Sequence, residues 1–264
     1  MSALGRVVVI GAGFAGLAAA AALTARGHAV TLLERAGRVG GKAQHVLAAG
    51  ARVDLGPTIL TDPEPLTRLF DLLGVPADAA CLERVDPGLV ATFPGGARLD
   101  IHSDRARMTA ALRALGPRAV EDWQRMLDLG GRARRLAGHF YARGDVSTAR
   151  DAWRFLAGGG ASLGDVVPFA RRGSLAHLLD ATMRTPELVR LFAHFARFVG
   201  LDAGRAPAVT VVIPYLLATS GAWHPQGGFS ALAEAIRDVA VKRGLTVETA
   251  ERVTHLEHTR GRVT

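Results

Sequence analysis

The run from Arg6 to Lys42, RVVVIGAGFAGLAAAAALTARGHAVTLLERAGRVGGK, constrains the fold more than any other part of the chain. It opens with Val7 to Ile10, a short β-branched stretch that favours a strand buried on both faces of a parallel sheet. Gly11, Gly13 and Gly16 follow at G-x-G-x-x-G spacing. In this pattern the first glycine permits a tight turn, the second lets backbone approach a pyrophosphate, and the third brings helix against strand.

The residues after these glycines predict the rest of a nucleotide-binding unit. Residues 14–26 are rich in alanine and predict a helix, stopped by Gly27, whose N-terminal amides and dipole attract a diphosphate. A second strand is predicted from Ala29 to Leu33, ending at Glu34, about 20 residues on, where an acid binds the ribose hydroxyls. An acid there favours FAD or NAD over NADP. The expected cofactor contacts are Gly11, Ala12, Gly13, Phe14, Ala15, Gly16 and Glu34.

Two other interpretations of this run are weaker. A buried alanine-rich helix explains neither the glycines nor Glu34. Residues 7–25 carry no charge and follow a basic residue, which is also typical of a signal peptide or membrane anchor. The three glycines and the strand that ends at Glu34 argue against that interpretation.

The sequence after Glu34 separates FAD from NAD. Arg35, Gly40, Gly41 and Lys42 give the pattern ERxxxxGGK, which resembles the flavoprotein superfamily that contains amine oxidases and carotenoid desaturases. Two more glycines and a cation would let a second loop close on the negative diphosphate. Standing alone, Gly40 and Gly41 would indicate only an ordinary turn.

Length and composition predict a globular α/β protein. With 264 residues and 49% hydrophobic content, the chain can bury a sizeable core. We expect a Rossmann-like FAD-binding domain with a parallel sheet, formed by residues 1–75 and 221–264. A mostly helical substrate domain, residues 76–220, is expected to interrupt it.

The net charge of +8 is carried almost wholly by arginine, and genomic composition explains this as well as function does. Dispersed basic residues and 6% aromatic content argue against nucleic-acid binding, so an anionic membrane surface is the better functional explanation. A single cysteine, Cys81, allows no intramolecular disulfide and no cysteine metal cluster, which fits the cytoplasm, with peripheral binding at the inner membrane face. Residues 206–223 are uncharged but contain Pro207 and Pro214, so we expect them inside the protein or against a bilayer.

Local signals predict further elements. Residues 47–55 predict a hairpin that turns at Ala49 and Gly50, and Thr61 or Asp62 is expected to cap a helix with Pro63 in its first turn. Helices are also expected to start at Ser103 and at Pro117, with a flexible break at residues 158–160.

Thr185 and Pro186 are predicted to open the most amphipathic helix of the chain. Helix packing explains each of its apolar residues better than a ligand role does. As a set they could line a tunnel for a long apolar substrate, a hypothesis that a solid core would overturn. The set is Leu188, Leu191, Phe192, Phe195, Phe198 and Val199.

Three further segments resemble the phytoene desaturase family, which includes hydroxycarotenoid desaturases and carotenoid isomerases. They are DLGPTILTDPEPL from Asp54, GAWHPQGGFSALAEAI from Gly221 and AERVTHLEHTRGRVT from Ala250. The resemblance extends from residue 6 to residue 264, with a loosely matching centre at about residues 76–185. It implies that the backbone of Gly56, Pro57 and Thr58 lies near the flavin ring and that Val253, in a strand pair, holds the adenine.

The chain also departs from the resembled family. An acidic residue usually precedes the Gly-x-Trp, but here the stretch is PYLLATS, and Gln226 replaces the cation often found in the P-x-G-G turn. Members of that family are nearly twice as long, and their second half supplies another FAD-contacting segment. We therefore expect this chain to be a fragment or a truncated form.

The resemblance implies a reaction. Its members bind FAD non-covalently and oxidise a saturated C–C bond of an apolar polyene, with a hydride passing to the flavin and a proton leaving the neighbouring carbon. Because the cofactor supplies this chemistry, we predict no catalytic residue and no metal ligand. Two alternatives stay open: a nucleotide-binding fragment without turnover, and an amine-oxidase-like enzyme acting on a polar substrate. Nothing in the sequence predicts an oligomeric state.

Overall fold

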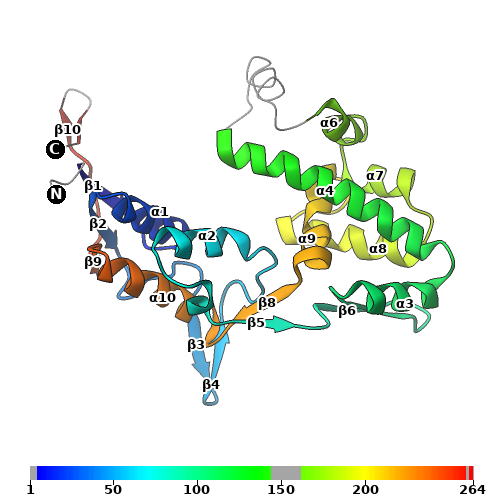
Figure 1. Cartoon of the computed structure of the whole chain (residues 1–264), viewed down its shortest axis with the longest axis horizontal. Helices are drawn as coiled ribbons and strands as arrows, with labels where there is room; N and C mark the ends of the chain where they lie inside the picture. Colours follow the sequence, from blue (N-terminus) through cyan, green and yellow to red (C-terminus); the bar gives the residue numbers. More distant parts are fainter. Residues whose placement is uncertain (1–4, 144–161, 260–261, 264) are drawn as a thin grey trace. The chain divides into compact units, whose positions relative to one another are not determined.

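The computed structural model describes residues 5–143, 162–259 and 262–263 of the chain (Figure 1). The chain divides into two compact units. Unit 1 comprises Met1–Arg84 and Trp223–Thr264, and unit 2 is the intervening segment, Val85–Ala222. The predicted break at residues 158–160 lies outside the described residues.

Unit 1 is built on a three-stranded parallel sheet. Its strands are β1 (Arg6–Ile10), β2 (Ala29–Glu34) and β9 (Thr246–Thr249), in the order β1-β2-β9. The first two strands and the helix that joins them, α1 (Phe14–Ala25), confirm the predicted strand, helix and strand. Beside α1 packs α10 (Gly228–Lys242), and both helices contribute to the core of unit 1. An α/β fold with a parallel sheet is therefore confirmed.

The prediction that the first strand is buried on both faces is wrong for the described residues. Val7 and Val9 face the core, together with Val30 and Leu32 of β2. The alternate residues of β1, Val8 and Ile10, are 60% and 51% exposed. Strand side chains alternate between the two faces of a sheet. The helices α1 and α10 therefore cover one face, and the other face is open in the described part of the chain.

A hairpin and several short elements complete unit 1. Strands β3 (His45–Ala48) and β4 (Ala51–Asp54) pair antiparallel, which confirms the predicted hairpin and its turn. Helix α2 (Glu64–Leu72) has Pro63 as its N-cap, so the prediction of Thr61 or Asp62 is wrong. The remaining elements are the 3₁₀ helix η1 (Ala77–Ala80), the paired strands β5 (Leu82–Val85) and β8 (Ala222–Pro225), and the antiparallel pair β10 (His258–Thr259) and β11 (Arg262–Val263).

Unit 2 begins with an antiparallel hairpin, β6 (Leu89–Thr92) and β7 (Arg98–Ile101), and continues with helices. The helices are α3 (Arg105–Leu115), α4 (Ala119–Arg143), α6 (Leu163–Ala170), α7 (Leu175–Thr182), α8 (Pro186–His194), η2 (Phe195–Val199), η3 (Ala208–Val211) and α9 (Val212–Ser220). The long helix α4 packs against α3, α6 and α9. Its approach to α9 is close, because a Cβ at Gly130 would come within 2.2 Å of the Cβ of Tyr215.

Two helix starts in unit 2 differ from the sequence prediction. Asp104, not Ser103, is the N-cap of α3, and its Oδ1 accepts a hydrogen bond from the Arg107 amide at 2.7 Å. A carboxylate cap satisfies one of the free amides of the first turn. Helix α4 begins at Ala119, two residues after Pro117.

The uncharged segment 206–223 lies largely inside unit 2. Ala206 and Val211 are completely buried, and Leu217 of α9 is 4% exposed. Of the two predicted environments, the protein interior is the one observed for these residues. In the described part of the chain, no helix is both long enough and apolar enough to cross a bilayer.

The tunnel hypothesis for the aromatic helix is not supported. Phe192 and Phe195 are 0% and 1% exposed, and their rings pack against Trp123 and Phe198 at centroid distances of 5.7 and 5.3 Å. Phe192 and Phe195 therefore belong to a packed core, whereas Phe198 and Val199 are 55% and 50% exposed. Close packing leaves no room for a ligand beside the rings of Phe192 and Phe195.

A capping interaction in unit 2 gives a pH-dependent prediction. The carboxylate of Asp165 accepts hydrogen bonds from Arg135, at 2.6 Å, and from the amide and hydroxyl of Ser162. The Arg135 hydrogen bond, followed by those from Ser162, lowers the pKa of Asp165 to about 2 from 3.8. A lowered folded-state pKa adds stability above the unfolded value, and this stability is lost as the pH falls from 3.8 to about 2.

Replacing Asp165 with Asn is therefore expected to lower the unfolding free energy by about 1–2 kcal/mol at pH 7, because Arg135 is half exposed and solvent weakens the pair. Urea unfolding at pH 7 and at pH 2 measures the difference between the two proteins. It should shrink at pH 2. A difference that is equal at both pH values would contradict the ionised cap.

Candidate nucleotide-binding site

The turn between β1 and α1 requires glycine at two of the three glycine positions of the G-x-G-x-x-G pattern, Gly11 and Gly16. Gly11 has φ +94°, in the left-handed region that favours glycine, and its amide donates to the carbonyl of Leu33 at 2.8 Å. A Cβ at Gly16 would come within 1.9 Å of the carbonyl oxygen of Gly11. The turn and the helix therefore touch through backbone alone, as the spacing predicts.

The N-terminus of α1 is open to an anion. Gly13 is the N-cap and supplies no side-chain cap, and the first turn contains no acidic residue. The first amides of a helix have no partner within the helix, so a diphosphate placed here would accept hydrogen bonds from them. Ala15 is exposed at this end, whereas Phe14 packs edge-on against Phe229 with ring centroids 6.2 Å apart. The backbone of Phe14 is thus available to the site, while its ring packs against the core of unit 1.

Ala12 is fixed by three contacts. Its side chain is completely buried, its amide donates to Oε2 of Glu34 at 2.7 Å, and its carbonyl accepts from the amide of Gly40 at 2.8 Å. Ala12 thus links the first glycine turn, the acid at the end of β2 and the second glycine loop.

The carboxylate of Glu34 is 8% exposed and lies at the end of β2. Besides Ala12, it accepts the amide of Ala36 at its other oxygen, at 2.9 Å. A carboxylate oxygen has two lone pairs, so each oxygen keeps one acceptor position. Glu34 therefore fixes the backbone at Ala12 and Ala36 and can still accept hydrogen bonds from a pair of hydroxyls.

The second glycine loop lies against the first. Gly40 forms a parallel bridge with Gly13, and a Cβ at Gly41 would come within 2.9 Å of the Cα of Gly13. Gly41 also has φ +58°. Arg35 and Lys42 are both exposed at this loop, so their charges are accessible to an anion.

The Gly56–Thr58 segment is held against the start of the P-x-G-G segment. A Cβ at Gly56 would come within 2.1 Å of the carbonyl oxygen of Lys42, so only glycine fits there. The ring Nδ1 of His224 donates to the carbonyl of Thr58 at 2.9 Å, and Leu60 bridges to Trp223. Pro57 is exposed between them. The structure thus brings residues 56–58 beside residues 223–224, which are far apart in the sequence.

The segment after β9 runs beside Glu34. The amides of Ala250 and Glu251 donate to the carbonyls of Ala36 and Glu34, each at 2.9 Å. Val253 follows two residues later, half-buried. It lies between β9 and β10 in irregular structure, so its expected place within a strand pair is wrong. The chain does return at this point to the end of β2 that carries the acid.

Sequence reasoning missed four residues where the β3–β4 hairpin meets the N-terminus of α10: His45, Asp54, Gly228 and Ser230. A Cβ at Gly228 would come within 2.6 Å of Oδ1 of Asp54, and Gly228 has φ +83°. That Oδ1 atom is buried and has no hydrogen-bond partner in the described part of the chain. His45 shares a 2.8 Å hydrogen bond with Ser230 in the first turn of α10. Asp54 belongs to the segment DLGPTILTDPEPL and Gly228 to the segment GAWHPQGGFSALAEAI. The family resemblance of these two segments is the sequence signal that could have identified both residues.

These observations fit a dinucleotide cofactor. Two glycine loops provide a backbone surface without Cβ atoms, and the open N-terminus of α1 adjoins it. Oδ1 of Asp54 is buried and has no hydrogen-bond partner among the residues that the structure describes. The chemistry matches a diphosphate with an attached nucleoside. The fold and this site therefore define a dinucleotide-binding protein of the Rossmann type.

The comparison with known proteins is more specific. Residues 14–264 match the family described as flavin containing amine oxidoreductase, and the chain belongs to that family. It is 35% identical over 266 residues to a phytoene dehydrogenase from Streptomyces griseus, covering 98% of this chain and 50% of that protein. It is 32% identical to a 4,4'-diapolycopene oxygenase from Methylomonas sp, covering 97% of this chain and 51% of that protein. The chain thus spans about half the length of the curated relatives it matches.

Solved structures share the fold at low sequence identity. An oxidoreductase from Methanosarcina mazei is 18% identical, with a TM-score of 0.57 over 98% of this chain and 54% of that chain. Putrescine oxidase bound to putrescine is 20% identical, with a TM-score of 0.57 over 94% of this chain and 51% of that chain. Family membership implies a flavin cofactor.

Proposed function

We propose that this chain is the flavin-binding part of an FAD-dependent oxidoreductase that dehydrogenates C–C bonds of a long apolar polyene in carotenoid biosynthesis. The observation that carries the proposal is the similarity, over 97–98% of the chain, to proteins named for carotenoid substrates. The glycine loops and Glu34 support the cofactor assignment independently.

The proposed cofactor is FAD, bound non-covalently. The backbone from Gly11 to Gly16, with the second loop at Gly40 and Gly41, would face the diphosphate, and the exposed cations Arg35 and Lys42 would balance its charge. Glu34 would bind the ribose hydroxyls, since each carboxylate oxygen keeps one free lone pair.

The remaining contacts concern the two ends of the cofactor. Because the chain returns to Glu34 through Glu251, Val253 is proposed to hold the adenine. The Gly56–Thr58 backbone, fixed by His224, is proposed to lie near the flavin ring. FAD, when bound, supplies the two-electron oxidation chemistry, so these residues need only bind and orient it.

Substrate binding is proposed for residues 76–220, with residues 1–75 and 221–264 binding FAD. Unit 2 contains a largely apolar groove of about 360 Å³, lined along β6 and by Arg190, Leu191 and His194 of α8. Such a lining suits a long apolar molecule. A peripheral position on the cytoplasmic side of an anionic membrane, where such a polyene dissolves, is supported by the net charge of +8.

The test uses purified chain incubated with FAD. We expect a visible flavin absorbance band that co-elutes with the protein on gel filtration and separates from it after denaturation, and bleaching of that band when phytoene in detergent is added without oxygen. Putrescine, added as a matched amine control, should not bleach it.

The other two outcomes distinguish the two alternative functions. Chain that binds FAD and is not bleached by phytoene supports a nucleotide-binding fragment without turnover. Bleaching by putrescine supports an amine-oxidase-like enzyme, which the likeness to putrescine oxidase does not favour, since at 20% identity it shows the fold alone.

A further inference from the structure

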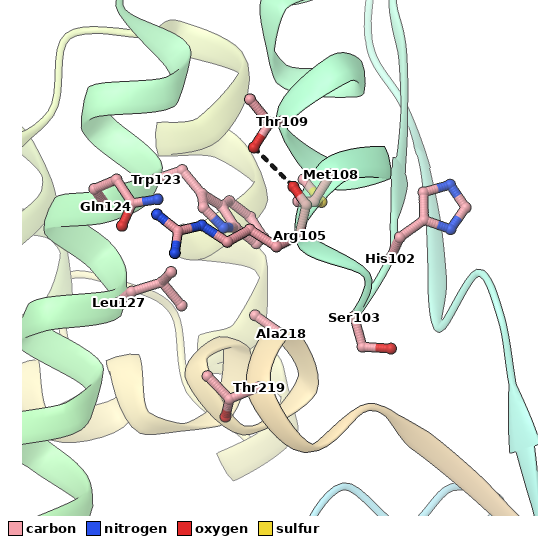
Figure 2. A pocket seen from close by; sticks show the side chains of 10 residues that line it. All are labelled: His102, Ser103, Arg105, Met108, Thr109, Trp123, Gln124, Leu127, Ala218 and Thr219. Atoms are coloured by element: carbon pink, nitrogen blue, oxygen red, sulfur yellow. Dashed lines mark hydrogen bonds between the residues drawn. The ribbon is translucent and has the colours of Figure 1, made fainter.

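Unit 2 contains a second cavity that the flavin site does not use. It has a volume of about 310 Å³ and lies among α3, α4 and α9 (Figure 2). Its lining comes from His102, Ser103, Arg105, Met108, Thr109, Trp123, Gln124, Leu127, Ala218 and Thr219. This volume is at the lower end of the range for small-molecule sites.

The base of the cavity is apolar and closely packed. Trp123 and Met108 are each 3% exposed, and the indole of Trp123 packs on Phe192 with ring centroids 5.7 Å apart. Leu127 and Ala218 add aliphatic surface. A ligand here would meet a preformed apolar wall, so it would lose little free energy to rearrangement of the protein.

The rim carries one exposed cation and one amide. Figure 2 shows Arg105 reaching from the start of α3 toward Gln124, whereas the ring of His102 and the hydroxyl of Ser103 point away. The hydroxyls of Thr109 and Thr219 donate to the carbonyls of Arg105 and Tyr215, at 2.7 and 2.8 Å. Their oxygens therefore remain as acceptors only.

The carboxylates near this rim already have partners. Asp86 pairs with His102 and with Arg107, and the pKa of Asp86 is lowered chiefly by the His102 hydrogen bond. Asp104 caps α3. Within the described residues, the guanidinium of Arg105 has no ion pair, so a ligand anion would not compete with a protein carboxylate for it.

We propose that this cavity binds an amphiphilic monocarboxylate, with its apolar body against Trp123 and Leu127 and its carboxylate at Arg105 and Gln124. Arginine presents a planar pair of donors that matches a carboxylate, and the Gln124 amide adds a third. One cation suits one negative charge better than the two of a phosphate monoester. The absence of a carboxylate or an inward-pointing imidazole in the described lining gives no site for a cation.

The test is calorimetric titration of the full chain with octanoate, and with octanol as the neutral ligand of equal chain length. We expect one octanoate site per chain and binding of octanol weaker by about tenfold or more. Arg105→Gln should weaken octanoate binding by about tenfold and leave octanol binding unchanged. This variant should fold normally, because Arg105 is exposed and a cation at a helix N-terminus is unfavourable.

Two further variants locate the site. Leu127→Trp should fill the cavity and weaken both ligands, whereas Arg190→Gln, at the separate groove beside β6, should change neither. The proposal is overturned if octanoate does not bind at roughly 1 mM, if octanol binds equally well, or if Arg105→Gln or Leu127→Trp binds octanoate like the unaltered chain. It is also overturned if Arg190→Gln alone loses binding. None of these readouts depends on flavin binding, so failure here leaves the proposed function unaffected.

Discussion

A Gly16→Ala variant is expected to lose FAD binding and much of the stability of unit 1. The added Cβ would stand 1.9 Å from the carbonyl oxygen of Gly11, and backbone cannot move aside as a flexible side chain can. The strand turn and α1 must separate, which we expect to lower the unfolding free energy by about 3 kcal/mol. FAD and ADP affinity, measured by titration, should each fall by tenfold or more, about 1.4 kcal/mol per factor of ten.

The matched control is Gly37→Ala, in the loop after β2. A Cβ there meets no atom within 4 Å, so stability and cofactor affinity should stay unchanged. If Gly16→Ala bound FAD and unfolded like the Gly37→Ala protein, the close packing of turn and helix would not exist.

A Glu34→Ala variant is expected to be affected almost as strongly. It removes the acceptors of two backbone amides, those of Ala12 and Ala36, at a site that is 8% exposed. Leaving the buried Ala12 amide unpaired costs about 1–3 kcal/mol, whereas the amide of the exposed Ala36 can bond to water, so the unfolding free energy should fall by about 2 kcal/mol. Denaturant unfolding measures this loss, and FAD titration should show affinity lower by about tenfold or more.

Glu251→Ala provides the control for charge. Glu251 is exposed, and its backbone amide, not its side chain, contacts the Glu34 carbonyl. The Glu251→Ala protein should therefore match the unaltered chain in stability and in FAD affinity. Equal losses in the two variants would mean that negative charge at this edge, and not the Glu34 hydrogen bonds, is what matters.

The first nucleotide-binding segment could be predicted from the sequence because its signals are local. Four β-branched residues, three spaced glycines and an alanine-rich helix each specify backbone geometry within a few residues. The structure accordingly has β1, α1 and β2 where they were expected. The G-x-G-x-x-G spacing also predicted that α1 approaches the glycine turn closely at Gly16. A glycine is needed there because a Cβ would clash with the backbone of Gly11.

What the sequence did not predict depends on residues far apart in the chain. Strand β9 joins β2 across more than 200 intervening residues, and Asp54 meets Gly228 only because β4 packs against α10. The hairpin of β6 and β7 has strands of only four residues each, too short for a clear alternation. For the aromatic residues of α8 and η2, periodicity identified an apolar face but could not distinguish a packed core from a tunnel lining.

The open face of the parallel sheet has a consequence for how copies of this chain behave in solution. Among the described residues β1 is an edge strand, so Val8 and Ile10 present apolar surface there and the free edge can pair with a strand of a neighbouring copy. The net charge of +8 opposes such contacts by repulsion between copies. At 0.1 M salt the repulsion between charges more than about 10 Å apart is largely screened, whereas the attraction between apolar surfaces remains. Raising the ionic strength is therefore expected to favour self-association of the chain.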